Sequence, residues 1–506
     1  MTTKYGLLCS VAVCTLVVSG HASAQTAPQI NTQMQQLQQQ IQQLQQQLQS
    51  LQTQVSTQAT QQRQVQAAPA AAAAAAPAPH VTQSAANRFS LESADGQYSI
   101  GLTGQLHFDA GGYAYHPDGP ATVPHDLNSG VNARRARLGL VGKFAGDWLY
   151  TFVYDFGGST DSGTGGINAG GVEKAYVTYN GLNKGPVPLA FDLGYQDVPF
   201  TLDEATSSND LMFMERASSQ VIAANIAAGD FRSAFGVRSN DSRYWAGVYV
   251  TGPTAGSNHS NTVAPTNGNG EPLGAFGRAT YQVLQDPDYS LHVGVDVEGL
   301  MKPAASGGVR NLTLSDRPEL RIDPTTTSLL TAAFGTATNP LNNASAFGAE
   351  VAGGFQNLFV QGEGYNYRIS RQGLPENTFW GGYLEGSWTI TGEHRNYLPA
   401  AGAYSGIIPA NPFSLSTGQW GAFELAGRMS YINLNDNFMA KAATPGANSV
   451  EGGRQTIYTL GLNWYLNPNI RFMFDYLHGV VKKENAAGAQ AGASFDALAM
   501  RTQVGF

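Results

Sequence analysis

The chain has 506 residues, of which 42% are hydrophobic and 13% are charged, and 59 are glycine. Its formal net charge is −8, and all 36 acidic residues lie after residue 80, which argues against a nucleic-acid-binding protein. No run of 18 apolar residues follows the N-terminal region, so the sequence predicts no helical membrane span.

Residues 1–24 are predicted to be a secretory signal peptide. An apolar run at 5–18 is followed by a small-x-small cleavage site at 22–24. The apolar run is too short for a helix that crosses a bilayer. Cys9 and Cys14 would both leave with the signal, which excludes disulfides and thiolate metal sites from the mature chain.

Residues 25–66 are rich in glutamine and are predicted to form a coiled coil. Apolar residues recur at alternating steps of four and three, as in the a/d seam of a heptad repeat and unlike a disordered glutamine tract: Ile30, Met34, Leu37, Ile41, Leu44, Leu48, Leu51 and Val55. The mixed seam residues leave the number of helices in the bundle open. Residues 67–88 are predicted to be a linker of alanine and proline, which is semi-rigid because proline breaks helices.

From residue 97 to the C-terminus, apolar and polar residues alternate with the period of β-strands. The clearest case is the hairpin 131–156, which turns at 145–147. Sixteen strands are predicted, at 97–110, 131–144, 148–156, 172–179, 189–195, 231–238, 244–251, 274–284, 289–299, 344–352, 358–367, 379–391, 420–434, 454–466, 470–478 and 494–506. Ambiguous alternation in three of them also allows 14 or 18 strands.

Long and short connections between these strands largely alternate. This is the plan of an outer-membrane barrel, which has short periplasmic turns and long outer loops. A soluble β-sandwich has no reason to sort its loops in this way, and closure removes the open edges of so large a sheet. We therefore predict an all-β domain over residues 89–506, a 16-stranded antiparallel transmembrane β-barrel preceded by the α-helical coiled coil.

Charged residues of the barrel wall are expected to face the lumen, because lipid excludes charge. The alternation places these basic residues there: Arg135, Arg137, Lys143, Arg232, Arg238, Arg278, Arg428, Arg471 and Arg501. Guanidinium groups donate paired hydrogen bonds to phosphate and carboxylate, so a row of them would attract anions. Acidic residues such as Asp109, Asp155 and Asp296 fall on the same side, and the alternative is a lumen whose charges neutralise one another.

Two long segments are able to fold into the barrel and narrow it. One is 196–230, which contains Arg216, and the other is 392–418, which contains Arg395. Either could instead cap the barrel or contact another subunit. Arg216 and Arg395 complete the set of candidate pore-lining or anion-binding residues. A third long segment, 300–343, shows no clear period.

The sequence carries no motif of a known enzyme class. It has no G-x-S-x-G elbow, no H-E-x-x-H pair and no phosphate-binding glycine loop, so we predict that the chain is not an enzyme. His107, His116 and His125 straddle a strand end and a loop, and they are expected to be scattered and exposed to solvent. Neither a metal site nor a cofactor is predicted from them.

Five stretches of the chain resemble a known family. They are RRARLGLVGKFAGDW at 134–148, VPFTLDEATSSNDLMFMERAS at 198–218, TGEHRNY at 391–397, WGAFELAGRMSYINLND at 420–436 and GGRQTIYTLGLNWYLNPNIRFMFDYLHG at 452–479. These stretches are similar to the phosphate-selective porins of the O and P type. The resemblance implies a homotrimer of sixteen-stranded barrels, with anions passing along a ladder of arginines. It also implies a constricting loop at 198–218, a turn at 392–418 that reaches into the lumen, and, as in some members, a periplasmic N-terminal coiled coil.

The predicted function is that of a passive diffusion channel in the outer membrane of a Gram-negative bacterium. The channel would prefer anions, with phosphate or polyphosphate among the candidate solutes. Predicted partners are two further copies of the chain, outer-membrane lipid, small anionic solutes and the cell wall, the last through a periplasmic coiled coil. The alternatives are a non-selective general porin, and a trimeric envelope tether or adhesin in which the coiled coil is the active part. Only seven lysines follow residue 24, so the choice between phosphate and other anions stays open.

Overall fold

The computed structural model describes residues 27–66, 78–83, 89–119, 127, 129–157, 171–227, 230–253, 270–286, 288–322, 328–438, 446, 448–484 and 491–506. The chain divides into two compact units, residues 1–76 and 77–506. The predicted signal peptide at 1–24 and most of the predicted linker at 67–88 lie outside the described residues, and both stay predictions.

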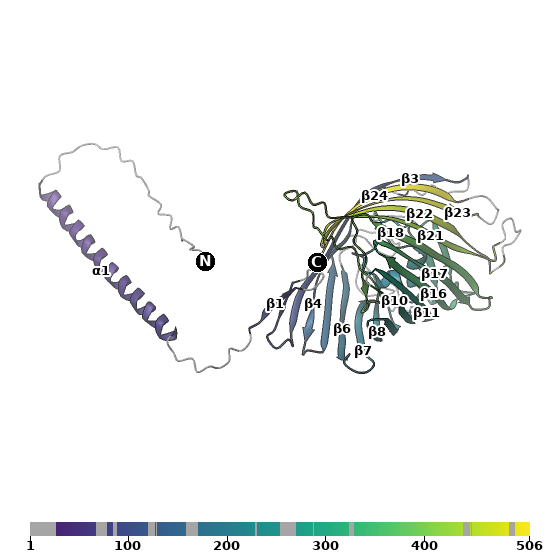
Figure 1. The fold of residues 1–506 in the computed structure, drawn as a ribbon, viewed down its shortest axis with the longest axis horizontal. Helices are drawn as coiled ribbons and strands as arrows, with labels where there is room; N and C mark the ends of the chain where they lie inside the picture. Colours follow the sequence, from purple (N-terminus) through teal and green to yellow (C-terminus); the bar gives the residue numbers. More distant parts are fainter. Residues whose placement is uncertain are drawn as a thin grey trace. The chain divides into compact units, whose positions relative to one another are not determined.

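The described part of the first unit is a single helix, α1 (Ala27–Gln66) (Figure 1). Glutamine is a good helix former, and the one proline, Pro28, lies in the first turn, where its missing N–H is not needed. Seam residues such as Ile41 and Leu44 are exposed, so α1 carries an apolar stripe that no other described residue of its unit covers. Its pairing with other copies stays a prediction. Among the described residues, no helix has both the length and the apolar character needed to cross a membrane.

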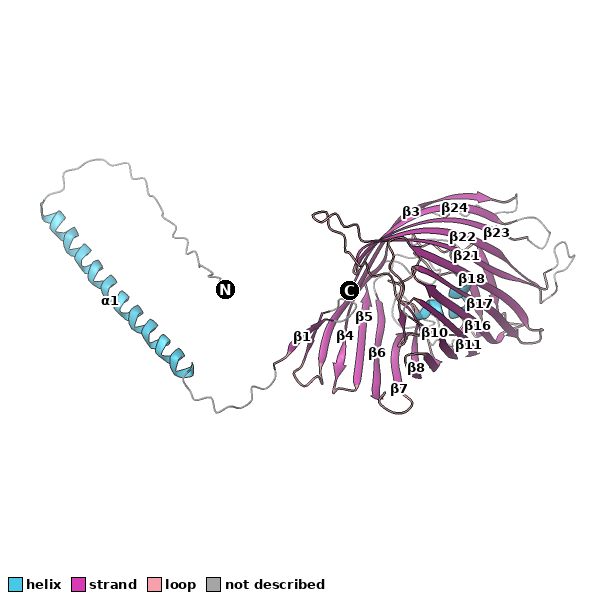
Figure 2. Ribbon diagram, viewed as in Figure 1, coloured by secondary structure: helices cyan, strands magenta, loops and turns pink. Residues whose placement is uncertain are grey.

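The second unit is built on one large antiparallel sheet, shown in magenta in Figure 2. Its sixteen long strands are β3 (Ser99–Pro117), β4 (Gly130–Phe144), β5 (Trp148–Asp155), β6 (Gly171–Leu182), β7 (Leu189–Asp197), β8 (Phe231–Asn240), β9 (Tyr244–Thr251), β10 (Leu273–Gln285), β11 (Tyr289–Lys302), β16 (Leu341–Phe355), β17 (Leu358–Arg371), β18 (Asn377–Thr389), β21 (Ala422–Asp436), β22 (Val450–Asn467), β23 (Ile470–Lys482) and β24 (Ala493–Gly505). Each pairs with the next one along the chain.

The sheet closes on itself because β24 pairs with β3, which places Arg501 opposite Asp109. At the end of the seam Gly104 and Phe506 exchange backbone hydrogen bonds of 2.9 and 3.0 Å. Closure leaves no open edge in the wall. Two short strands, β1 (His80–Gln83) and β2 (Phe89–Glu92), extend the sheet at the first residues of β3.

The two faces of the wall differ in kind. Outward side chains are apolar and exposed, among them Leu138, Phe152 and Leu498. Inward side chains are polar and buried under the contents of the lumen, as Arg278 and Arg501 are. An apolar outer belt around a polar interior is what a wall between lipid and a lumen requires. The predicted 16-stranded barrel is confirmed, and the counts of 14 and 18 are excluded.

Several shorter elements lie between the long strands. They are the helices α2 (Leu202–Ala205) and α3 (Ser218–Ala224), and the hairpins β12 (Ala305–Ser306) with β13 (Val309–Arg310), β14 (Leu312–Asp316) with β15 (Leu330–Phe334), and β19 (Tyr397–Leu398) with β20 (Ala403–Tyr404). The segment 300–343, which showed no period, therefore contains two hairpins. Helix α3 packs on β17, β18, β21 and β14, which puts it inside the barrel (Figure 2).

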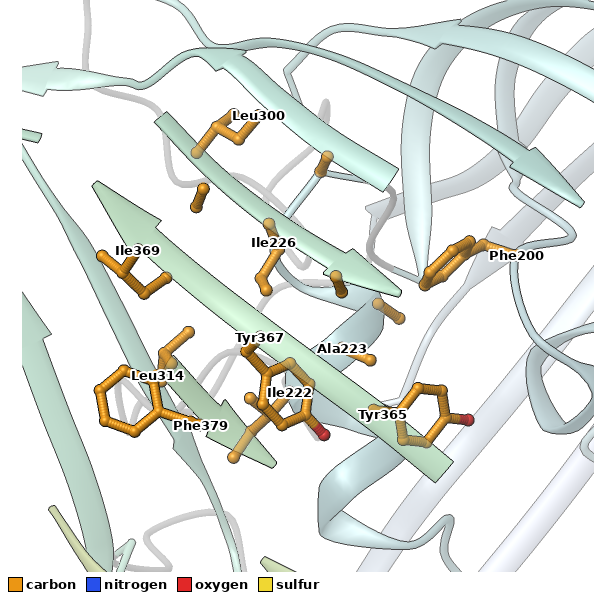
Figure 3. Packing of buried hydrophobic residues seen from close by; sticks show 14 of the residues in the cluster. Phe200, Ile222, Ala223, Ile226, Leu300, Leu314, Tyr365, Tyr367, Ile369 and Phe379 are labelled. Carbon is orange, nitrogen blue, oxygen red and sulfur yellow. The ribbon is translucent and has the colours of Figure 1, made fainter. Parts of the chain in front are cut away.

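An apolar core fills part of the lumen. Ile222, Ala223 and Ile226 pack with wall residues of β17 and β18, among them Tyr367 and Phe379 (Figure 3). Strict alternation predicts polar residues on the inner face of a wide barrel, so this core did not follow from the sequence pattern. It forms because α3 presents an apolar surface of its own to the wall, and burial of that surface fixes the helix in place.

Candidate functional site: the lumen and its arginines

The segment between β7 and β8 enters the barrel and stays there; we call residues 198–227 the lumen loop. Phe200 and Leu202 are fully buried. Thr201 adopts φ 72°, an uncommon value for a β-branched residue, and its hydroxyl accepts a hydrogen bond from the Glu204 backbone. The backbone amides of Leu202 and Asp203 donate to the two carboxylate oxygens of Glu363 on β17, at 2.7 and 3.1 Å. The wall therefore holds the beginning of the loop.

Arginines of the wall and of the segment between β18 and β19 hold the middle of the lumen loop by binding its backbone. Four guanidinium groups donate to loop carbonyl oxygens: Arg395 to Asp210 (2.6 Å), Arg471 to Leu211 (2.8 Å), Arg501 to Met214 (2.5 Å) and Arg428 to Glu215 (2.8 Å). We call Arg395, Arg428, Arg471 and Arg501 the clamp arginines. All four are buried, so these hydrogen bonds are made away from water and fix the path of the loop.

Glu215, a residue of the lumen loop, lies at the centre of a network of buried charges. Its carboxylate accepts a two-bond contact from Arg134 at 2.8 and 3.1 Å and a further bond from Arg501 at 2.9 Å. Arg321 and Arg135 lie at 3.5 and 4.0 Å. Burial alone would raise the pKa of Glu215, but the surrounding guanidinium groups, Arg134 first, hold that pKa well below its usual range. The surrounding arginines therefore favour the charged form of this buried carboxylate.

Other arginines on the inner face bind carboxylates of the wall. Arg278 binds Glu350 through two nitrogens at 3.0 and 3.2 Å, with both side chains fully buried. Arg238 binds Asp192 at 2.9 Å. The clamp arginines Arg395 and Arg428 also bind acids, Glu424 and Glu319, each at 2.8 Å.

A cavity of about 760 Å³ remains beside the lumen loop. Its wall is formed by β3–β6, by loop residues 204–210, and by the turn at 467–470 with Phe506, which places it toward the end of the barrel that has the short turns. Its basic lining residues are Arg135, Arg137, Lys174, Arg216 and Arg471. Its acidic lining residues are Glu173, Asp197, Glu204, Asp210 and Asp230. Ser207, Ser208 and Asn209 add uncharged hydrogen-bonding groups.

Two β-bulges aim adjacent charged residues into this part of the lumen. The register of β4 against β3 shifts at His107, so that both Arg134 and Arg135 are buried on the inner side. The register of β6 against β5 shifts in the same way and turns both Glu173 and Lys174 inward. A bulge inserts one residue and re-aims a side chain, which breaks the period of two. The alternation rule therefore missed Arg134 and Lys174.

His107 orients one of the cavity arginines, contrary to the expectation that it is exposed. The ring is fully buried. Nη1 of Arg135 donates to His107 Nδ1 at 3.3 Å, so the ring proton is on Nε2, which lies 2.9 Å from Oδ1 of Asn209. A neutral His107 thus links Arg135 to the lumen loop.

The basic side chains of the cavity have nearby acids. Arg137 binds Asp155 at 2.9 Å and also contacts Glu173, and Lys174 binds Asp197 at 3.3 Å. Burial raises the pKa values of Glu204 and Asp210 in the loop, although neighbouring guanidinium groups oppose this rise, Arg216 beside Glu204 and Arg395 beside Asp210. The cavity therefore holds paired charges whose balance depends on the protonation of its acids.

The structure separates the predicted site residues into groups. Arg135, Arg137, Arg216 and Arg471 line the larger cavity, and Arg238 lines a smaller one of about 220 Å³ next to it. The following line neither cavity: Lys143, Arg232, Arg278, Arg395, Arg428 and Arg501. Lys143 instead binds Glu92 of β2 at 2.6 Å. Sequence reasoning also missed Arg321, which lies in a segment without any period.

Comparison with known proteins identifies relatives. Residues 100–506 match the family model described as phosphate-selective porin O and P. The chain is 24% identical to Porin O of Pseudomonas aeruginosa over 80% of this chain and 88% of that protein. It is 26% identical to an uncharacterized protein of Caulobacter vibrioides over 76% of this chain and 70% of that protein. Among solved structures, an anion-selective porin from Comamonas acidovorans is similar with a TM-score of 0.44 and 15% identity, covering 81% of this chain and all of the other.

Proposed function

Because the chain belongs to the phosphate-selective porin O and P family and is therefore an outer-membrane channel, we propose that its basic cavity residues guide small anions through the lumen. Arg135, Arg137 and Lys174 come together in one cavity beside the lumen loop, and this is the observation that carries the proposal. Arginine forks and loop hydroxyls and amides are the donors that bind phosphate oxygens. Phosphate and pyrophosphate are accordingly the solutes that we propose first.

The paired charges of the cavity favour a second candidate, a general porin without ion preference. Arg137 and Lys174 each bind an acid of the wall, so their field is partly cancelled. The two candidates differ in the sign and size of the potential at which no current flows across a salt gradient. An anion channel gives a reversal potential that differs from zero with the sign set by anion flow, and a general porin gives a reversal potential near zero.

We further propose that the active form is a homotrimer with a periplasmic coiled coil. The exposed seam of α1, with Met34, Leu48 and Leu51, supports association of several copies, and the number three is the one that the family resemblance implies. The linker would join this stalk to the barrel, and the stalk would contact the cell wall. If the chain is instead a tether or adhesin, deletion of residues 25–80 abolishes its role and leaves conductance intact.

The test is single-channel recording of the purified protein in a planar lipid bilayer, with chloride, phosphate and pyrophosphate as the anions. We expect conductance steps in groups of three, anion preference, and a preference that falls in Arg137→Ala. Cation preference would refute the anion channel. A potential near zero in the unaltered protein would refute it as well and would support a general porin.

A further inference from the structure

Three carboxylates meet on the inner face of the wall, outside both cavities. Asp296 lies on β11, Glu350 on β16 and Glu363 on β17, three neighbouring strands. Each side chain is buried, and one oxygen atom of each lies within 4.8 Å of the other two. Glu350 and Glu363 are direct cross-strand partners, an arrangement in which like charges repel.

The surrounding groups satisfy two of the three carboxylates. Glu350 is bound by Arg278 and lies 3.0 Å from Nε2 of His292. Glu363 accepts two backbone N–H bonds from the lumen loop and one from the Tyr383 hydroxyl at 2.6 Å. Arg278 is thus the guanidinium group in direct contact with the cluster among the described residues.

Asp296 is the member that lacks partners. Neither of its carboxylate oxygens has a hydrogen-bond partner among the described residues, although the side chain is only 4% exposed. Asp296 Oδ1 occupies the space above Gly348. If Gly348 carried a side chain, its Cβ atom would lie 2.1 Å from this oxygen. A buried carboxylate without a partner is costly, so a ligand at this place would stabilise the fold.

An independent group points to the same place. Gly348 on β16 pairs with Asp296 of β11 on one side and with Tyr365 of β17 on the other, so the three residues form one row across the sheet. The Tyr365 hydroxyl is buried, has no partner among the described residues, and points away from the apolar core that the ring joins (Figure 3). Tyr365 follows Glu363 by two residues and therefore shares its face of β17, so this oxygen atom without a partner is a further potential ligand for a cation.

We propose that Asp296, Glu350 and Glu363 bind one hard divalent cation, Ca²⁺ or Mg²⁺. Carboxylate oxygens are the ligands that these ions prefer, and a charge of +2 offsets the excess negative charge of the cluster. The ion would tie β11, β16 and β17 together. Because Glu363 also holds the amides of Leu202 and Asp203, the ion would further fix the beginning of the lumen loop. This site does not depend on which solute the channel passes.

Equilibrium dialysis of the purified, chelator-treated protein against radioactive Ca²⁺ at neutral pH tests this site. We expect one high-affinity Ca²⁺ per protomer in the unaltered protein, and binding at least about tenfold weaker in Asp296→Asn. Glu298→Gln is the matched control, because Glu298 is a buried acid of the same strand outside the group of three, and it should bind as the unaltered protein does.

Two outcomes would overturn the proposal. If the unaltered protein binds neither Ca²⁺ nor Mg²⁺, the carboxylates are neutralised by protons. If Asp296→Asn binds as tightly as the unaltered protein, the cation lies elsewhere. Should Asp296→Asn fail to fold, crystals of the unaltered protein with Mn²⁺ decide: an anomalous peak between the three carboxylates supports the site, and a map without one there contradicts it.

Discussion

The two sides of the lumen use the same kind of residue for different purposes. On β21–β24 and the segment before β19, the clamp arginines lie beneath the lumen loop and bind its carbonyl oxygens, and one of them, Arg471, also borders the cavity. On β4 and β6, Arg135, Arg137 and Lys174 border the open cavity. Position on the inner face alone therefore does not make an arginine part of an ion path. An arginine covered by the lumen loop uses its hydrogen bonds to hold that loop, whereas an arginine that borders the cavity is accessible to a solute.

The strongest perturbation of the clamped side should be Glu215→Gln. Loss of this carboxylate leaves Arg134 and Arg501 buried with less compensation, and breaking a buried ion pair costs about 3–5 kcal/mol. The free energy of unfolding in guanidinium chloride, with the protein in detergent, measures the effect. Glu92→Gln at the barrel end is the control, and an equal loss in both variants would contradict the special role of Glu215.

The pH dependence of this contribution follows from the direction of the shift. The pKa of Glu215 is depressed, so its stabilisation is present above the unfolded pKa and is lost only as pH falls through the lower folded value. The lumen loop should therefore stay docked from neutral to mildly acidic pH. Protease protection of the loop measures this, and release of the loop near neutral pH would be inconsistent with the depressed pKa.

A second variant, Arg395→Lys, keeps the positive charge of a clamp arginine but removes its planar guanidinium group. In Arg395→Lys the bidentate contact with Glu424 and the bond to the Asp210 carbonyl cannot both form. We expect a noisier open-channel current and an unchanged ion preference, because the charge remains. Single-channel recording gives both quantities. A quiet current would mean that this guanidinium group does not restrain the loop.

On the open side, Lys174→Gln should change selectivity and leave stability nearly unaltered. The ammonium group is partly exposed beside Asp197, and such ion pairs contribute only about 0.2–1 kcal/mol to stability. Loss of its positive charge from the cavity should lower the anion-to-cation permeability ratio. The reversal potential in a KCl gradient is the measurement. Lys184→Gln, in the short turn after β6 and outside the cavity, should have no effect on that ratio.

A smaller effect is expected from pH on the same side. Burial raises the pKa of Glu204, so this carboxyl group takes up a proton before ordinary glutamates do as pH falls. Each proton removes a negative charge from the cavity, and anion preference should increase as pH is lowered from about 8 to about 5. Glu204→Gln should abolish the Glu204 part of this response, and an unchanged response in that variant would assign it to other acids.

The fold could be predicted almost entirely from the sequence, and the reason is physical. A wall one residue thick between lipid and a lumen forces strict alternation, which Leu138 and Phe152 in the first hairpin and Leu498 in the last strand display. Turn lengths then fix the order and number of the strands. The coiled coil, the signal peptide and the trimer stay predictions.

The candidate site could be predicted only in part. Arg135 and Arg137 were placed by alternation, whereas Arg134 and Lys174 were missed because bulges insert a residue and leave no mark in the pattern. Arg278 and Arg501 do face inward, but their cover comes from segments that contact them across the barrel. The alternation of apolar and polar residues along a strand carries no information about such long-range contacts. Clamp arginines and cavity arginines therefore cannot be told apart in the sequence.

The most direct test of this division is the reversal potential of Arg137→Gln beside that of Arg137→Lys, each measured across a KCl gradient. Arg137 borders the cavity and binds Asp155 there. We predict that anion preference falls in Arg137→Gln, which exposes Asp155 and Glu173, and is kept in Arg137→Lys, which retains the charge. Equal reversal potentials in the unaltered protein and Arg137→Gln would contradict the account, because the cavity charge would then have no part in selecting ions.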